Sequence, residues 1–175
     1  DLRGPRTNEA LELVRRLWTE TNVTFEGRFT TVNDFTLKPM PTQKPHPPIW
    51  VAGRKEVAMR RAVRYGQGWL PYMYSPEQLA NSVTAIESMA ASEGRSMDDF
   101  THGLYIFTAV HEDGPTAVRM AAEKLGTQYA QDFEKLVGKY ALAGTPEQCR
   151  ERLQQYVDAG ARLIILDRKS TRLNS

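Results

Sequence analysis

Hydrophobic residues in this chain form two kinds of pattern. Short runs rich in apolar and β-forming residues, typical of buried strands, occur at residues 49–52, 68–72, 103–110 and 161–166. Between these runs the apolar residues recur with a period near 3.6, which predicts helices at residues 56–65, 76–94, 116–125, 130–140 and 146–160. The sequence therefore predicts four strands separated by helical segments.

Strands that alternate with helices in this way are typical of parallel βα units. Four such units make either a small open sheet or half of a (β/α)8 TIM barrel. Two features favour the half barrel: the chain begins at Asp1 without a methionine, and no helical pattern follows the last strand. We therefore expect an α/β chain that forms half of a TIM barrel and exposes apolar residues at strand edges.

The first 48 residues precede these units. Thr7, Asn8 and Glu9 are expected to cap a helix whose apolar stripe runs through Trp18. Residues 23–37 contain apolar positions broken by a turn, which predicts a short β-hairpin inserted before the first unit. Five prolines between residues 38 and 48 predict a stiff, extended linker, in which we expect His46 to be exposed.

Composition narrows the class of protein. With 175 residues, 41% hydrophobic and 25% charged, the chain is typical of one globular domain, which we place at residues 1–167. No apolar run reaches the roughly 18 residues of a membrane helix. The single cysteine, Cys149, fits a reducing, cytoplasmic setting, and we expect it to be a core residue.

The last eight residues are treated separately. Residues 168–175 are polar and aperiodic, and we expect them to be a non-native tail. They contribute three cations, and the rest of the chain holds 20 Lys and Arg against 21 Asp and Glu. The basic balance therefore comes from the tail, and nucleic-acid binding is not indicated.

The first predicted strand leads into the main candidate site. Gly53, Arg54 and Lys55 follow this strand and precede the helix at residues 56–65. A helix start offers free backbone N–H groups and a positive dipole end, and two cations beside it favour a bound phosphate. The alternative, that both cations are simply solvated beside an ordinary strand–helix joint, stays open.

The other reactive side chains give weaker patterns. His111 follows the third strand, and the carboxyl ends of barrel strands are where catalytic residues lie, so it is a candidate catalytic residue. Glu112, Asp113 and Gly114 more closely fit a helix-entry turn than a pair of catalytic carboxylates. We predict no metal site, because no Cys, His and carboxylate set has ligand spacing.

Several motifs resemble the carboxyl-terminal half of the bacterial luciferase-like monooxygenases. The most specific are Pro-Pro-Ile-Trp-Val-Ala-Gly at residues 47–53 and Gly-Gln-Gly-Trp at residues 66–69. Further matches are Phe-Glu-Gly-Arg-Phe at residues 25–29 and Gly-Thr-Pro-Glu-Gln at residues 144–148. The resemblance extends to Leu166, with one departure: Gln67 stands where relatives usually have Asp, so a role that needs a charge there is in doubt.

The resemblance implies a TIM-barrel enzyme that uses reduced FMN and molecular oxygen to oxidise a small organic substrate. It implies that this chain is a partial barrel made of the last four βα units. It implies that Gly53 and Arg54, with Lys55 and Val57, contact the flavin phosphate. Trp69 and Tyr72 are placed to wall the coenzyme pocket, with packing in the core or at the rim as the alternative. A separate reductase would supply the flavin, and the parent protein would be a homo-oligomer.

Two alternatives remain for the function. One is a dehydrogenase or reductase that uses an 8-hydroxy-5-deazaflavin coenzyme. The other is a half-barrel homologue that binds a ligand without catalysis. We expect the first four βα units to lie outside this chain, together with much of the catalytic machinery, so the chain alone is expected to be inactive.

Overall fold

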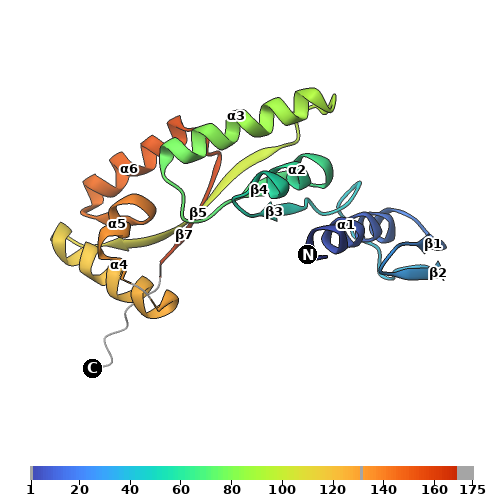
Figure 1. Cartoon of the computed structure of the whole chain (residues 1–175), viewed down its shortest axis with the longest axis horizontal. Coiled ribbons are helices and arrows are strands. Elements are labelled where there is room, and N and C mark those ends of the chain that lie inside the picture. The colour runs from blue at the N-terminus through green and yellow to red at the C-terminus, as the bar shows by residue number, and fades with distance from the viewer. Residues whose placement is uncertain (1, 131, 169–175) are drawn as a thin grey trace.

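The structure is a computed structural model that describes residues 2–130 and 132–168 (Figure 1). The helices are α1 (Arg3–Thr19), α2 (Glu56–Tyr65), α3 (Pro76–Ser92), α4 (Gly114–Tyr129), α5 (Glu134–Tyr140) and α6 (Pro146–Asp158). The strands are β1 (Val23–Glu26), β2 (Thr31–Phe35), β3 (Trp50–Ala52), β4 (Gly68–Leu70), β5 (Thr101–Val110), β6 (Leu142–Gly144) and β7 (Leu163–Asp167). All of the expected tail except Arg168 lies outside the described residues.

The main sheet has five parallel strands, in the order β3-β4-β5-β6, with β7 also paired to β5. Strand β5 is long enough to pair with three neighbours along its length: β4 at its start, β7 over residues 103–107 and β6 over residues 108–110. The prediction of four strands is corrected by β6, which has only three residues and no β-branched side chain. It pairs with residues 108–110 of β5, beyond the part of β5 that pairs with β4, and the local pattern does not reveal this pairing.

In the amino-terminal part, the start of the helix differs from the prediction and the β-hairpin agrees with it. Helix α1 begins at Arg3 rather than at a cap around Thr7, whose hydroxyl donates to the Arg3 carbonyl 2.8 Å away within the helix. The hairpin of β1 and β2 forms as expected. The Glu9 carboxylate accepts hydrogen bonds from the backbone N–H groups of Arg28 and Phe29, and this fixes the hairpin turn on α1.

His46 is buried, with 9% of its surface exposed, so the expectation of an exposed linker histidine was wrong. Its ring centroid lies 6.0 Å from that of Trp18, which comes from α1. The linker turns back over α1, and the stripe of that helix covers the imidazole. The sequence of the proline-rich segment alone does not predict this packing, because Trp18 belongs to a distant helix.

The sheet has two faces with different neighbours. The outer face is formed by Val51, Trp69, His102, Leu104, Ile106, Ile164 and Leu166. Except at the exposed Leu166, it packs on α2, α3 and α6, above the sheet in Figure 1. The inner face is formed by Trp50, Ala52, Leu70, Tyr105, Phe107, Leu163, Ile165 and Asp167. This is the arrangement of part of a TIM barrel, in which helices surround the sheet and the inner face lines the interior.

The inner face is only partly covered. Leu163 and Ile165 are 38% and 41% exposed, which confirms the expectation of exposed apolar residues on the outermost strand. Helices α4 and α5 cover the inner face near the end of β5, where Phe107 packs against Leu125 and Phe133. Both helices are shifted from the predicted bounds: α4 runs from Gly114 to Tyr129, because Asp113 caps it through the Thr116 N–H at 3.0 Å.

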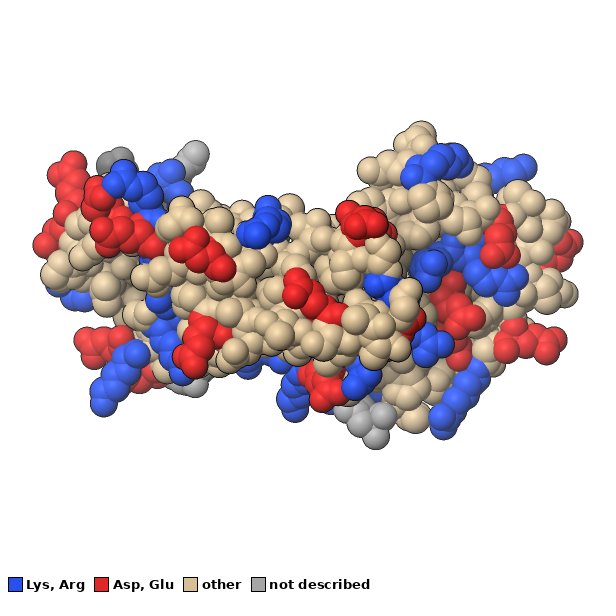
Figure 2. Space-filling view, turned by 90° about the horizontal axis from the view of Figure 1, so that it is seen from above, with Lys and Arg blue, Asp and Glu red and all other residues tan. Residues whose placement is uncertain are grey.

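The surface over α3 shows few charges, and charged side chains of both signs gather toward the two ends of the molecule (Figure 2). No single sign of charge dominates the face shown. Among residues 2–130 and 132–168, none of the helices has the length and apolar character that crossing a membrane requires.

Candidate functional site

The candidate site lies at the carboxyl ends of the parallel strands, which we call the rim. Its parts are the loop at residues 53–55 after β3, the segment at residues 71–74 after β4, and the ends of β5 and β7. Tyr72 forms an isolated parallel bridge with Tyr105 of β5, so the segment after β4 stays attached to the sheet. The topology therefore brings together side chains that are far apart in the sequence.

The loop after β3 requires glycine at its first position. Gly53 has a φ of +123°, and a Cβ atom there would lie 2.7 Å from the Cβ of Ala58 in α2. This close approach lets the chain turn directly from the strand into the helix. No side chain caps the start of α2, so the N–H groups of Glu56 and Val57 have no intrahelical partner, whereas that of Ala58 donates to the Lys55 carbonyl at 2.8 Å.

Two cations stand beside this helix start. The side chains of Arg54 and Lys55 are exposed and form no hydrogen bond or ion pair with another described residue. The Arg54 Cζ atom lies 5.5 Å from the centroid of the Tyr72 ring, which is itself 40% exposed. The exposed Val57 belongs to the first turn of α2, and its N–H is one of the free donors.

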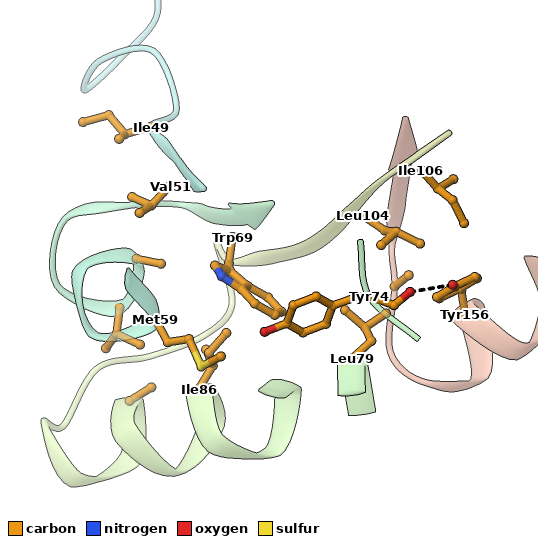
Figure 3. Packing of buried hydrophobic residues seen from close by; sticks show 14 of the residues in the cluster. Ile49, Val51, Met59, Trp69, Tyr74, Leu79, Ile86, Leu104, Ile106 and Tyr156 are labelled. Carbon is orange, nitrogen blue, oxygen red and sulfur yellow. Dashed lines mark hydrogen bonds between the residues drawn. The ribbon is translucent and has the colours of Figure 1, made fainter. Parts of the chain in front are cut away.

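Buried side chains hold the loop from beneath. The indole Nε1 of Trp69 donates to the Gly53 carbonyl at 2.8 Å, and the Tyr74 hydroxyl donates to the Arg54 carbonyl at 2.9 Å. The Tyr156 hydroxyl of α6 donates to the Tyr74 carbonyl at 2.6 Å (Figure 3). Two successive carbonyls of the loop are thus bound on the core side, so the loop is fixed to the core through its acceptors.

Trp69 was expected to wall the pocket, but it has no exposed surface and lies in the outer-face core beside Tyr74 (Figure 3). Trp69 therefore packs in the core, which the sequence analysis gave as the alternative to a place in the pocket wall. Tyr72 does lie at the rim. Gln67 accepts a hydrogen bond from the Ile49 N–H at 3.0 Å, so it fixes the start of β3 and needs no charge for that role.

These residues fit a phosphate group. A phosphate offers several oxygen acceptors with negative charge, and the loop offers free N–H donors, a positive helix end and two cations. The glycine at residue 53 keeps the approach to the backbone free of a side chain. The donor set is therefore complementary to a phosphate in both charge and hydrogen bonding.

A second group of polar side chains lies at the rim, and the sequence analysis did not predict it. The Tyr105 hydroxyl donates to Oδ2 of Asp167 at 2.6 Å, and this hydrogen bond is the main reason that the pKa of Tyr105 rises to about 12. Burial raises the pKa of Tyr129, with a further increase from nearby Tyr72 and Asp167. The pair joins residues 62 positions apart on β5 and β7, so only the strand register reveals it.

A cavity of about 200 Å³ lies beside this pair, between the end of β5 and α4. Its walls include the apolar residues Phe107, Val110, Met120 and Leu125, and the charged residues Asp167, Lys124 and Arg168 also line it. An apolar cavity that opens beside a few polar groups is typical of a small-molecule site.

The remaining candidates have structural contacts. Nδ1 of His111 accepts a hydrogen bond from the Asp113 N–H at 2.9 Å, within the turn into α4. Cys149 is buried, as expected of a core residue, and burial raises the pKa of its thiol. Within the described part of the chain, no three His, Cys, Asp or Glu side chains are grouped in a way that fits a metal ion.

Comparison with known proteins decides the family. A sequence model described as luciferase-like monooxygenase matches residues 1–163. This chain belongs to that family. An FMNH(2)-dependent dimethylsulfone monooxygenase from Pseudomonas putida is 28% identical over 193 residues, which cover 94% of the chain and 53% of that protein. An F420-dependent glucose-6-phosphate dehydrogenase from Microbacterium testaceum is 25% identical over 188 residues, covering 93% of the chain and 54% of that protein.

Solved structures show the same fold. An F420-dependent secondary alcohol dehydrogenase superposes with a TM-score of 0.84 at 19% identity, covering 94% of this chain and 56% of that one. The monooxygenase RslO1 from Streptomyces bottropensis superposes with a TM-score of 0.80 at 27% identity, covering 97% of this chain and 55% of that one. The luciferase-like chain therefore spans about half the length of these relatives, and its sheet corresponds to part of a TIM barrel.

Proposed function

We propose that this luciferase-like chain supplies the phosphate-binding half of a flavin-dependent monooxygenase that oxidises a small organic substrate. The observation that carries the proposal is the loop at residues 53–55. It joins a glycine that no other residue replaces without strain, two cations whose side chains form no hydrogen bond or ion pair with a described residue, and a helix start that no side chain caps. The similarity to the dimethylsulfone monooxygenase supports reduced FMN as the coenzyme.

In this proposal Gly53 gives the phosphate access to the backbone, and Arg54 and Lys55 neutralise its charge. The N–H of Val57 donates to a phosphate oxygen. Trp69 and Tyr74 act indirectly, because their hydrogen bonds to the loop carbonyls hold the donors in place. Tyr72 lies where it would border the ligand. The bound coenzyme would supply the redox chemistry, and the residues of this chain would orient it and shield it from water.

A deazaflavin-dependent dehydrogenase is the second candidate function. It is supported by the similarity to F420-dependent glucose-6-phosphate dehydrogenases and by the TM-score of 0.84 to an F420-dependent alcohol dehydrogenase. The loop at residues 53–55 contacts only the phosphate in this proposal, and both coenzymes carry one. The choice between them is therefore made by the groups that surround the ring.

We further propose that the other half of the barrel belongs to the same protein and covers the inner face. The exposed Leu163 and Ile165 support this, because a closed barrel buries the inward side chains of every strand. The complete enzyme would be a homo-oligomer that receives reduced flavin from a separate reductase. Without the covering half, we expect the chain to have no oxidoreductase activity.

A titration tests the proposed function. The full-length protein would be titrated with FMN and with the deazaflavin coenzyme, and wild type compared with Arg54→Ala. Loss of a charge-assisted contact should weaken binding by about 1.5–3 kcal/mol. Arg119→Ala is the matched control, because Arg119 lies on α4 and donates to the Thr116 hydroxyl. If neither coenzyme binds the wild-type protein, the homologue is non-catalytic or has lost its redox role, and the proposal fails.

A further inference from the structure

We propose that Tyr105 and Asp167 form a second binding point for the coenzyme, one that accepts a hydrogen bond from a hydroxyl or N–H group of the ligand. The proposal rests on the proposed function, since it concerns the same ligand as the loop at residues 53–55. It concerns a different part of that ligand, because the chemistry of the pair is opposite to that of the loop.

The position of the pair supports this role. Tyr105 and Asp167 come from neighbouring parallel strands and lie on the inner face, where the barrel interior would be. Asp167 is the last residue of β7, at the rim, and it also lines the cavity between β5 and α4. Both side chains are partly exposed, so a ligand at the rim has access to them.

The hydrogen bond inside the pair determines what it offers. The only proton of the Tyr105 hydroxyl is donated to Oδ2 of Asp167. The raised pKa of Tyr105, about 12, means that the phenol keeps this proton at ordinary pH. What remains free is the Oδ1 atom of Asp167, which has no partner among the described residues, and the lone pairs of the phenol oxygen. The pair is therefore an acceptor site that carries one carboxylate, and Lys124 and Arg168 line the cavity beside it.

The two ends of the rim are thus complementary to opposite groups. The loop with Arg54 offers donors and positive charge, which suit a phosphate. The pair with Asp167 offers hydrogen-bond acceptors, which suit hydroxyl or N–H groups. Strands β3, β4, β5 and β7 are successive neighbours. Three spacings of about 4.8 Å place the two ends on the order of 14 Å apart, which suits an extended ligand.

Tyr72 connects the two ends. Its ring stacks under the Arg54 guanidinium, and its backbone pairs with that of Tyr105. The ring contacts continue along the rim from Tyr105 to Phe107 and from Phe107 to Tyr129, with centroid distances of 5.6 Å and 6.2 Å. Tyr72 therefore lies between the phosphate site and the acceptor site, and the rings of Phe107 and Tyr129 continue beyond Tyr105 toward α4. Two chemically different ends would hold a phosphorylated coenzyme in one direction only.

The test compares FMN with riboflavin, which lacks the phosphate, in the full-length protein. Asp167→Asn keeps the shape and the acceptor for Tyr105 but replaces the free carboxylate oxygen with a donor. We expect it to raise the Kd of both ligands about tenfold, since a charge-assisted hydrogen bond is lost. Arg54→Ala should raise the Kd of FMN alone. If the deazaflavin coenzyme binds instead, it and its phosphate-free form replace FMN and riboflavin.

Tyr105→Phe tests separately whether Tyr105 positions the Asp167 carboxylate. It removes the hydrogen bond that holds Asp167, and we expect a smaller rise in Kd of about threefold for both ligands. Asp158→Asn is the matched control, because Asp158 is on α6 and accepts from the Gln154 side chain. Tyr140→Phe is the control for the phenol. Neither control should change either Kd.

The outcomes separate the two proposals. If wild type binds FMN and Asp167→Asn binds FMN and riboflavin like wild type, the acceptor site is wrong and the proposed function stands. An effect of Asp167→Asn on FMN alone also overturns the inference, since it would indicate a change at the phosphate. If wild type binds no flavin and no deazaflavin, both proposals fail together.

Discussion

The two faces of the sheet in this luciferase-like chain contrast in how completely they are buried. Trp69, Leu104 and Ile106, on the outer face, have at most 1% of their surface exposed. Leu163 and Ile165, on the inner face, are 38% and 41% exposed although they are equally apolar. The exception on the outer face is Leu166, 48% exposed, because no described helix lies over the end of β7.

The contrast separates stability from function in the same strands. Side chains alternate between the faces, so each strand contributes to a packed layer on one side and to the rim and interior on the other. The outer face supplies the buried apolar area, which is the main stabilising term in folding. The inner face carries the Tyr105–Asp167 pair and remains open for a ligand or for the other half of a barrel. Three comparisons of matched positions test this division.

The largest difference is expected between Leu104→Ala and Ile165→Ala. Leu104 is fully buried, so its truncation leaves a cavity and should lower the free energy of unfolding by about 2–5 kcal/mol. Ile165 is 41% exposed, and its truncation in this chain should cost less than about 1 kcal/mol. Urea unfolding followed by circular dichroism measures both values.

The same pair of variants tests the covering of the inner face. In the full-length protein, the cost of Ile165→Ala should rise toward that of Leu104→Ala, because the other half of the barrel would bury the side chain. An unchanged, small cost there would mean that the inner face stays open, and the proposal of a closed barrel would be wrong.

The next difference is expected between Trp69→Phe and Trp50→Phe. Trp69→Phe removes the donor for the Gly53 carbonyl and should cost about 1–3 kcal/mol of stability. It should also weaken FMN binding, because the loop at residues 53–55 loses one of its two buried anchors. Trp50 is half-buried on the inner face and makes no side-chain hydrogen bond within the described residues, so Trp50→Phe should cost less than about 1 kcal/mol. Equal effects of the two variants would remove the special role of the indole N–H.

The smallest differences concern pH. Burial lowers the pKa of His102 below 6.5, a nearby Glu87 partly opposes this, and Arg162 adds to it. The unfolded chain therefore binds more protons at low pH, so the contribution of His102 is present above pH 6.5 and is lost as the pH falls below it. Urea unfolding between about pH 8 and pH 5 should show this loss, and His102→Gln should reduce it.

Tyr105 on the inner face behaves in the opposite way. Its pKa is raised from 10.0 to about 12, first by the hydrogen bond to Asp167, so its contribution is present below pH 10.0 and is lost as the pH rises through about 12. In a pH titration followed by phenolate absorbance, Asp167→Asn should show one tyrosine with a high pKa fewer than wild type. If the titration is identical in the two proteins, the hydrogen bond does not form in solution.

Much of the fold could be predicted from local sequence. The period of the apolar residues gave the helices α2, α3 and α6, and Ser75 and Thr145 begin the last two through capping boxes that the sequence already displays. The loop at residues 53–55 was also predicted, because its glycine, its cations and the following helix are adjacent in the sequence. Such features depend on neighbours a few residues apart, which is the range over which propensity and capping act.

Only the tertiary structure decided the rest. Strand β6 forms by pairing with residues 108–110 at the far end of β5, and the Tyr105–Asp167 pair exists because two distant strands share a register. His46 is buried because the linker turns back over α1, and Trp69 lies in the core because its position in β4 points to the outer face. The sequence alone determined most of the helices and strands, though not β6, and where a phosphate is expected. Which side chains meet across the sheet depended on long-range pairing, which no local pattern of residues specifies.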